Sequence, residues 1–212
     1  MHKRAAQKAE TRRRIADAAL ALHAERGVLG AKPTDIAARA DVSLTTYYMH
    51  FPSLGDLVRA CTTRGREMIP PPDPTTVTAL PPDPAVRIPA MVRTLFQYYE
   101  AREPWLYAGR TEERHIPEVQ AVMEGLRRVR DAFVQSAMES LKIRRETKGV
   151  VTALVDFWAW RILRRDVGLT QEEVINGVTA TVKQIARSIV PGRRPRRAGR
   201  PTGKGSRAGG GG

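Results

Sequence analysis

The chain has 212 residues, 42% of them hydrophobic and 27% charged, which is typical of a globular protein that buries a core. A single cysteine, Cys61, excludes an intramolecular disulfide, and no apolar run approaches the roughly 20 residues of a membrane span, so we expect a cytoplasmic protein. The net charge of +14 lies mostly at the two ends, because residues 1–69 hold twelve basic against seven acidic residues and residues 191–212 hold seven basic residues and no acid. This distribution favours a polyanionic partner over a membrane surface.

Residues 1–10 are polar and basic. They are expected to form either an arm that reaches a DNA groove or the frayed, solvated start of the first helix. That helix is predicted over residues 11–26, with Ile15, Ala19 and Leu22 on one face and Gly27 as its stop. His23 lies beside this apolar stripe, and we interpret it as a structural or partly exposed histidine rather than a ligand.

Two short helices joined by a tight turn follow. Pro33 suits the first position of a helix that runs to about residue 40, and Asp41 tolerates the left-handed backbone of a turn. Ser43 is a strong N-cap for a second helix over residues 43–48. That helix offers hydroxyls, rings and an imidazole but no acid, which suits contact with phosphates and base edges. The alternative is a small helical hairpin with surface aromatics.

Four segments of the first 57 residues indicate a particular kind of domain. In chain order they are RRRIADAALALHAERG, DIAARADVS, TTYYMHFPS and DL. In this order and spacing, residues 11–57 resemble the DNA-binding domain of the tetracycline-repressor (TetR) family of bacterial regulators. The resemblance implies an all-α homodimer, with an N-terminal three-helix helix-turn-helix domain, a helical ligand-binding and dimerisation domain, and residues 43–48 in the major groove. It also implies that Thr46, Tyr48 and His50 contact phosphates and backbone, and that Leu44, Thr45 and Tyr47 lie where bases are contacted. With Lys32 and Ser43, these residues form the predicted DNA-binding set.

Four positions depart from the family pattern. The family usually has glycine at Asp41, phenylalanine at His23, threonine at Lys32 and lysine at Leu54. Leucine in place of this lysine is expected to remove one phosphate contact per subunit. The affinity for DNA should then depend less steeply on the salt concentration. Lys32 restores a charge nearby.

Ser53 and Asp56 have the spacing of a capping box and begin a fourth helix, in which we interpret Cys61 as a small core residue. We therefore assign residues 1–69 to the DNA-binding domain. Residues 70–84 contain seven prolines, so we expect a stiff, extended linker without helix. A linker this long puts in doubt the joint that usually carries ligand occupancy to the DNA-binding domains of the family.

Residues 85–190 are assigned to an effector-binding and dimerisation domain of five helical segments. The first is expected to end at Glu103 and Pro104, and a short segment over residues 105–109 follows. Longer helices are predicted over residues 117–143, 148–165 and 171–189. The last two carry apolar residues on more than one face, which favours self-association, and the family usually dimerises through these helices.

Aromatic and sulfur-containing side chains of this domain could line an effector pocket. Each one alone is more often a core residue, but together with the resemblance they favour a pocket for a planar or lipophilic effector. The candidates are Met91, Phe96, Tyr99, Trp105, Met123, Phe133 and Trp158.

No catalytic motif stands out. The four histidines lie far apart in the sequence, and neither a glycine-rich phosphate loop nor a nucleophile elbow is present. Glu112, Glu113, His115 and Glu118 could gather metal ligands, but Pro117 interrupts them and a solvated charged turn explains them better. We expect no enzyme activity, no cofactor and no metal.

Residues 191–212 are rich in proline, glycine and arginine, and we expect them to be a disordered basic tail. The sequence GRP at residues 199–201 resembles part of an AT-hook, although Ala198 occupies the place of one arginine. Generic attraction to phosphates is the alternative.

These observations together predict a homodimeric transcriptional repressor that binds palindromic operator DNA and is released by a small apolar or aromatic effector. The alternative is a ligand-independent or architectural DNA-binding regulator whose second domain only dimerises. A third possibility, an enzyme that carries a helix-turn-helix, would require activity that survives loss of the first domain.

Overall fold

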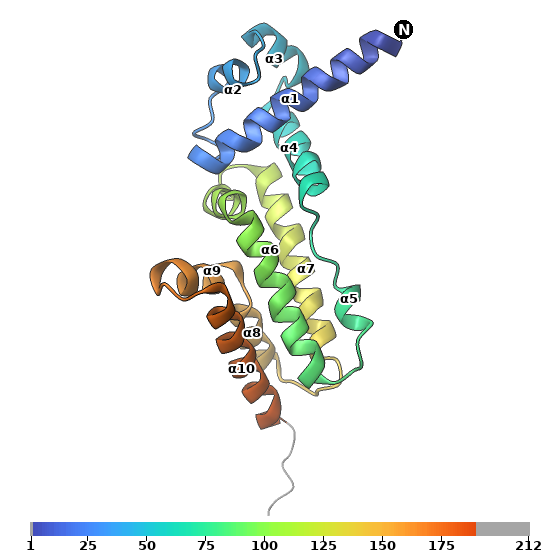
Figure 1. Ribbon diagram of the computed structural model, residues 1–212, viewed down its shortest axis with the longest axis vertical. Helices are drawn as coiled ribbons and strands as arrows, with labels where there is room; N and C mark the ends of the chain where they lie inside the picture. The colour runs from blue at the N-terminus through green and yellow to red at the C-terminus, as the bar shows by residue number, and fades with distance from the viewer. Residues whose placement is uncertain (1, 190–212) are drawn as a thin grey trace, which may run out of the picture.

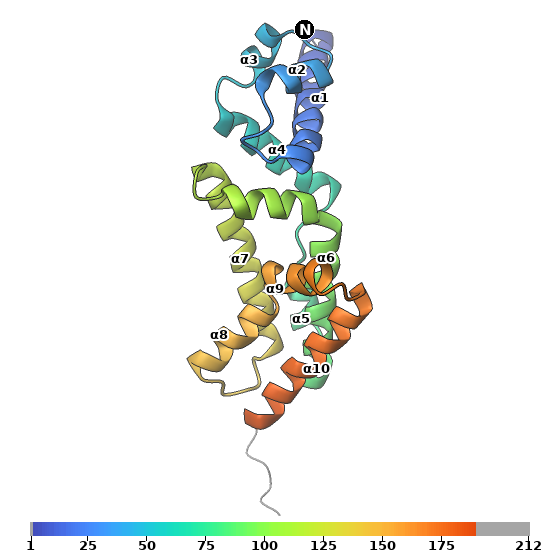
Figure 2. The ribbon, with the colours of Figure 1, turned by 90° about the vertical axis from the view of Figure 1, so that its left-hand side faces the viewer.

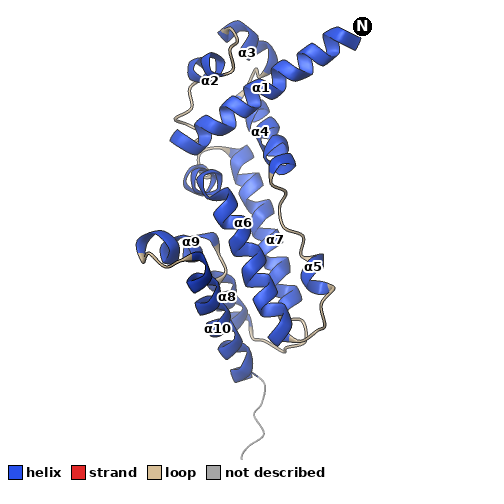
Figure 3. Cartoon of the chain, viewed as in Figure 1, coloured by secondary structure: helices blue, strands red, loops and turns tan. Residues whose placement is uncertain are grey.

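The computed structural model describes residues 2–189 of the chain, and within them it contains helices, turns and loops but no strand (Figure 3). The all-α prediction is therefore confirmed. The first domain comprises α1 His2–Arg26, α2 Pro33–Arg39, α3 Leu44–His50 and α4 Leu54–Met68. The second comprises α5 Thr75–Thr78, α6 Pro84–Glu112, α7 Pro117–Ala137, α8 Arg145–Leu154, α9 Phe157–Arg161, a π-helical turn at Ile162–Asp166 and α10 Gln171–Ile189. Figure 1 shows the two domains stacked end to end.

The first domain packs around the apolar face of α1. Ile15 and Ala19 are completely buried, and Ile36, Phe51 and Leu57 from the other three helices or their ends close over them. The helix bounds follow the local signals. Gly27 adopts a φ of 80° after α1, and Pro33 is the first residue of α2. Residues 2–10 continue α1 rather than forming a separate arm.

α6 is longer than the sequence predicts. It continues through Pro104 to Glu112, so the expectation that Glu103 and Pro104 end it was wrong. Proline lacks the N–H that would bond to the carbonyl four residues earlier, and its ring distorts the preceding turn, but flanking turns can continue the helix. Figure 2 shows the result: α6 is bent, and its last part lies across the end of the second domain that faces α1 and α4.

The proline-rich segment is also not simply extended, because Thr75–Thr78 forms the short helix α5 between its two proline clusters. The expectation that this segment could not be helical was wrong. Val77 is buried in the core of the second domain. The buried Arg87 of α6 donates to the carbonyl oxygens of Thr78 and Leu80 at 2.8 Å each. These bonds attach the segment to α6.

The helix predicted over residues 148–165 is interrupted at Asp156. This residue caps α9 by accepting a hydrogen bond from the Trp158 N–H, and its carboxylate also pairs with Arg110 and Arg130. No helix in the described part of the chain is long and apolar enough to cross a membrane.

Candidate nucleic-acid interface and domain junction

α3 presents an exposed face that carries no charged side chain. Leu44 is 40% exposed, Tyr48 50% and Met49 77%, and Thr45 is exposed beside them. Ser43 fixes the start of this helix, because its side chain accepts the Thr46 N–H at 3.0 Å and lies 2.8 Å from the Thr46 hydroxyl. Asp41 in the preceding turn has a φ of 52°, the left-handed conformation expected for it.

Tyr47 points the opposite way from the rest of the predicted base-contacting residues. It is only 3% exposed, and its ring packs near Phe51 and edge-on against Tyr48 in the first core. A helix of this length has one face toward the core, and Tyr47 lies on it. We therefore remove Tyr47 from the set that could contact bases and add the exposed Met49, which the sequence analysis did not single out.

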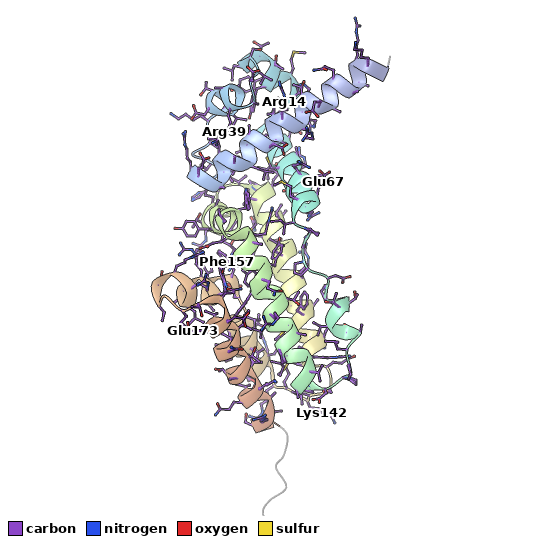
Figure 4. The ribbon with its side chains drawn as sticks, in the orientation of Figure 1. Arg14, Arg39, Glu67, Lys142, Phe157 and Glu173 are labelled. Carbon is purple, nitrogen blue, oxygen red and sulfur yellow. The ribbon has the colours of Figure 1, made fainter. Side chains whose placement is uncertain are left out.

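Two arginines of α1 hold α3 and its turn in place. Arg12 donates to the carbonyl oxygen of His50 at 2.5 Å, at the C-terminal end of α3, and its guanidinium lies 4.2 Å from the centre of the Phe51 ring. Arg14 donates to the carbonyl oxygen of Asp41 at 3.2 Å (Figure 4). The orientation of α3 is thus fixed by side chains outside the helix-turn-helix.

The positive charge near α3 comes from its neighbours. Lys8 on α1 and Lys32, the residue before α2, are exposed, whereas burial and the nearby charges of Lys8 and Arg12 lower the pKa of His50. These effects favour the neutral form of His50 at neutral pH, which can donate or accept a hydrogen bond. Leu54, which stands where the family has lysine, is 39% exposed.

The C-terminal part of α6 is hydrogen-bonded to the first domain. The Trp105 indole N–H donates to the Leu20 carbonyl oxygen at 2.9 Å. The Glu112 carboxylate accepts the backbone N–H groups of Val28 and Leu29 at 2.7 and 3.0 Å. Gly27 makes room for this carboxylate, since a Cβ there would lie 2.2 Å from a Glu112 oxygen.

Apolar contacts complete this domain junction. Val28 and Val58 of the first domain form one buried cluster with Ile116, Val119 and Met123 of the second. The two domains are therefore not joined through the proline-rich segment alone, because α6 contacts α1 and α7 contacts α4 directly.

A cavity of about 100 Å³ lies at this junction, between α1 and α4 on one side and α6 and α7 on the other. Of the predicted pocket residues, Trp105 and Met123 line it. A smaller cavity of about 30 Å³ lies deeper in the second domain and is lined by Tyr99 and again Met123.

The other predicted pocket residues line neither cavity. Met91, Phe96 and Phe133 are completely buried in the second core, and Trp158 packs edge-on against Tyr107 at 5.9 Å. These side chains are packed against their neighbours in the core. A sequence pattern cannot distinguish a packed core residue from one that lines a cavity, because both are large and apolar.

Cys61 is buried, and its burial raises the pKa of its thiol to about 12, so the thiol stays protonated. The acidic residues considered as metal ligands have other partners. Glu112 bonds the loop after α1, Glu113 pairs with Arg127 at 2.8 Å, and Glu118 lies 3.5 Å from Arg59. Among residues 2–189, no three histidine, cysteine or acidic side chains are grouped closely enough to hold a metal ion.

Comparison with known proteins agrees with this architecture. Residues 15–61 match the family described as bacterial regulatory proteins, tetR family. No curated protein sequence matches the chain.

Solved structures share the fold over most of the chain. One is AibR in complex with isovaleryl coenzyme A and operator DNA, with 19% identity, a TM-score of 0.62 and coverage of 81% of this chain and 97% of that one. A TetR family member from Streptomyces coelicolor A3 has 21% identity, a TM-score of 0.56 and the same coverage. The multidrug binding protein EbrR, complexed with imidazole, has 22% identity, a TM-score of 0.56 and coverage of 84% and 90%.

At these identities the neighbours show the fold alone, a helix-turn-helix domain followed by a helical domain. The match over residues 15–61 includes all of α2 and α3, which present the candidate nucleic-acid interface. Over residues 15–61, which carry the helix-turn-helix, the chain matches the tetR family of bacterial regulatory proteins.

Proposed function

We propose that this regulator is a homodimeric repressor that binds palindromic operator DNA and is released by a small effector. The observation that carries the proposal is the exposed, uncharged face of α3, held by Ser43, Arg12 and Arg14. An amphipathic helix fixed in this way fits a major groove. Residues 1–69 would bind DNA, residues 70–84 connect the domains and contribute α5 to the second core, and residues 85–190 would dimerise and bind the effector together with residues of α1 and α4.

The proposed contacts fall into two groups. Leu44, Thr45 and Met49 would meet base edges, where apolar and hydroxyl groups distinguish thymine methyl groups and acceptors. Phosphate contacts would come from the second group, which comprises Lys32, Ser43, Thr46, Tyr48 and His50 together with Lys8 of α1. The basic tail, residues 191–212, lies outside the described residues, and its contribution to affinity remains part of the proposal.

The outward faces of α8 and α10 support homodimerisation. In the middle of the two helices the exposed residues are uncharged and mostly small, and they comprise Gly149, Val150, Ala153, Asn176, Gly177, Ala180 and Thr181, whereas the exposed charged residues Arg145, Glu146, Glu172, Glu173 and Arg187 lie nearer the helix ends. A Cβ at Gly149 or Gly177 would meet no atom within 4 Å, so a second copy could approach these helices closely. Two such subunits would bring two α3 helices to half-sites about 34 Å apart.

The cavity at the domain junction supports effector control. Its walls combine first-domain residues such as Leu20 and Val58 with second-domain residues such as Trp105 and Met123. A ligand there would change the contacts that set the angle between the domains, and hence the spacing of the two α3 helices. EbrR and AibR, which share the fold, have been solved with small molecules bound.

Selection of DNA fragments by the purified full-length protein tests the proposal. We expect one near-palindromic sequence to be enriched, and Thr46→Ala to weaken operator binding, because it removes a proposed phosphate contact that positions α3. The ligand-independent alternative predicts a steep salt dependence with a low specificity ratio. Enrichment of no sequence, or a Thr46→Ala variant with unchanged operator affinity, would contradict the proposed role of α3.

A further inference from the structure

The junction cavity has an unusual charge pattern for an apolar pocket. Arg66 of α4 and Arg102 of α6 line it, and no aspartate or glutamate does. Within the described residues neither arginine has a carboxylate within 4 Å, whereas Arg59 and Arg64, also on α4, pair with Asp56 and Asp17. Both arginines therefore border the cavity without a carboxylate of the protein to pair with them.

Arg102 is held in position rather than free in solvent. Its Nη1 donates to the Gly65 carbonyl oxygen at 3.3 Å, and its guanidinium lies 4.7 Å from the centre of the Trp105 ring. A Cβ at Gly65 would lie 2.6 Å from Arg102 Nη2, so glycine makes this position possible. The Nε atom of Arg102 is buried and has no hydrogen-bond partner. A buried donor without a partner costs free energy.

His23 is a second residue of the cavity wall that has a nitrogen without a partner. It is 5% exposed, lines the cavity, and its Nε2 is buried without a hydrogen bond. Burial lowers the pKa of His23 to about 4, so the imidazole is neutral at neutral pH and can donate or accept one bond. The phenylalanine that the family has at this position would leave no polar atom unpaired.

Apart from Thr62 and Tyr98, the remaining walls are mostly apolar, and part of them continues inward. Leu106, Met123 and Leu126 line both the junction cavity and the smaller cavity behind it. A ligand with a hydrophobic body could therefore extend from the arginines toward the second core.

We propose that the junction cavity binds a small apolar molecule with one acidic group, such as a carboxylate. The acidic group accepts hydrogen bonds from Arg102 and Arg66, His23 Nε2 bonds a further oxygen, and the apolar part packs against Trp105, Met123 and Leu126. Charge-assisted hydrogen bonds of this kind are the strongest that arginine makes, whereas a cation would face two uncompensated guanidinium groups. This inference rests on the proposed effector control and names the chemical class of the effector.

Three probes of equal length and different charge test the ligand class: octanoate, octan-1-ol and octylammonium. Titration of the full-length protein by calorimetry, with tryptophan fluorescence as a second readout, is expected to show octanoate binding about tenfold more tightly than octan-1-ol. Octylammonium is expected not to bind measurably. Equal binding of octanoate and octan-1-ol, preferential binding of the cation, or binding of none of the three overturns the inference.

Three arginine variants locate the acidic group. Arg102→Met and Arg66→Met keep an apolar stem and should each remove most of the preference for octanoate, while octan-1-ol binding changes little. Arg128→Met on α7 is the matched control, because Arg128 is exposed, has no carboxylate partner in the described structure and lines neither cavity. Arg66 is exposed, so its variant should fold even if Arg102→Met does not. Loss of the preference in Arg128→Met, or its retention in Arg66→Met and a folded Arg102→Met, counts against the site.

Operator binding measured with and without octanoate separates this inference from the proposed function. A protein that selects an operator but shows no preference for octanoate refutes the ligand class alone. A protein that binds octanoate through Arg102 and Arg66 but selects no operator refutes the proposed function alone.

Discussion

His23 is a polar residue at a position that is almost fully buried, and its environment makes stability depend on pH. Burial lowers its pKa from 6.5 to about 4, and no hydrogen bond to Nε2 offsets the loss of solvation. The folded state therefore favours the neutral form of the His23 imidazole. The unfolded chain, in which the side chain is solvated, takes up the proton first as pH falls.

We predict that the free energy of unfolding falls between about pH 6.5 and pH 4 through His23. Above this window both states are neutral at His23 and its contribution is constant. Inside the window the unfolded state binds more protons, so stability decreases as pH falls, by about 2 kcal/mol at about pH 5. Urea denaturation at about pH 7.5 and about pH 5 measures the change. His23→Phe should lose less stability over this range than the wild type, and an equal loss in both proteins contradicts the prediction.

Single residues with a local conformational role were predictable from the sequence, and those that act across the domain junction were not. Gly27, Asp41, Ser43 and Ser53 have the backbone or capping roles expected of them, because each role depends on neighbours within a few residues. Glu112 bonds Val28 and Leu29, more than eighty residues away in sequence. No local pattern reveals such a pair.

At the level of elements, the short α3 depends on interactions beyond its own length. It has only seven residues, so it cannot be stable alone, and its conformation is maintained by the Ser43 cap, by Arg12 at its other end and by Tyr47 in the core. α6 shows the converse case. Its sequence predicts a break at Pro104, yet the C-terminal part stays helical and is anchored on the first domain through Trp105 and Glu112. Tertiary contacts therefore explain both why the short α3 is helical and why α6 continues past Pro104.

Removal of the N-cap tests how far operator binding depends on the position of α3. Ser43→Ala should lower stability by about 1 kcal/mol, because the Thr46 N–H loses its acceptor, and should also weaken operator binding. Ser53→Ala is the matched control, since Ser53 caps α4 by accepting the Asp56 N–H at 3.1 Å. Thermal unfolding and operator titration measure the two effects. Similar losses of operator affinity in both variants would show that general stability, rather than the position of α3, is responsible.

For the whole molecule, the open question is which surface a second copy covers. The sequence predicted apolar residues on several faces of the last helices, but Val174, Ile175, Val178 and Val182 of α10 are buried within the subunit. In the middle of α10 the exposed residues are small and uncharged and include Gly177 and Ala180, while Glu172, Glu173 and Arg187 are exposed toward its ends. Hydrophobic periodicity cannot divide apolar residues between the subunit core and an interface, because burial in either place requires the same residue types.

Placing a charge on this face should separate the two subunits. Ala180→Arg introduces a long cation at the centre of the proposed interface, where a second α10 or α8 would have to bury it without a partner. Sedimentation or light scattering at micromolar concentration is expected to show a dimer for the wild type and a monomer for the variant. Operator affinity should fall by at least about a hundredfold, because a monomer binds one half-site and loses the second set of contacts.

Ala121→Arg is the matched control, since Ala121 is exposed on α7, outside the proposed interface. It adds the same charge and should remain dimeric. Its DNA affinity therefore measures how much an added arginine alone increases nonspecific binding. The decisive comparison is the ratio of operator to nonspecific affinity in the two variants, because the added arginine raises nonspecific binding equally in both. A dimeric Ala180→Arg protein with wild-type operator affinity would place the interface on another face of the second domain.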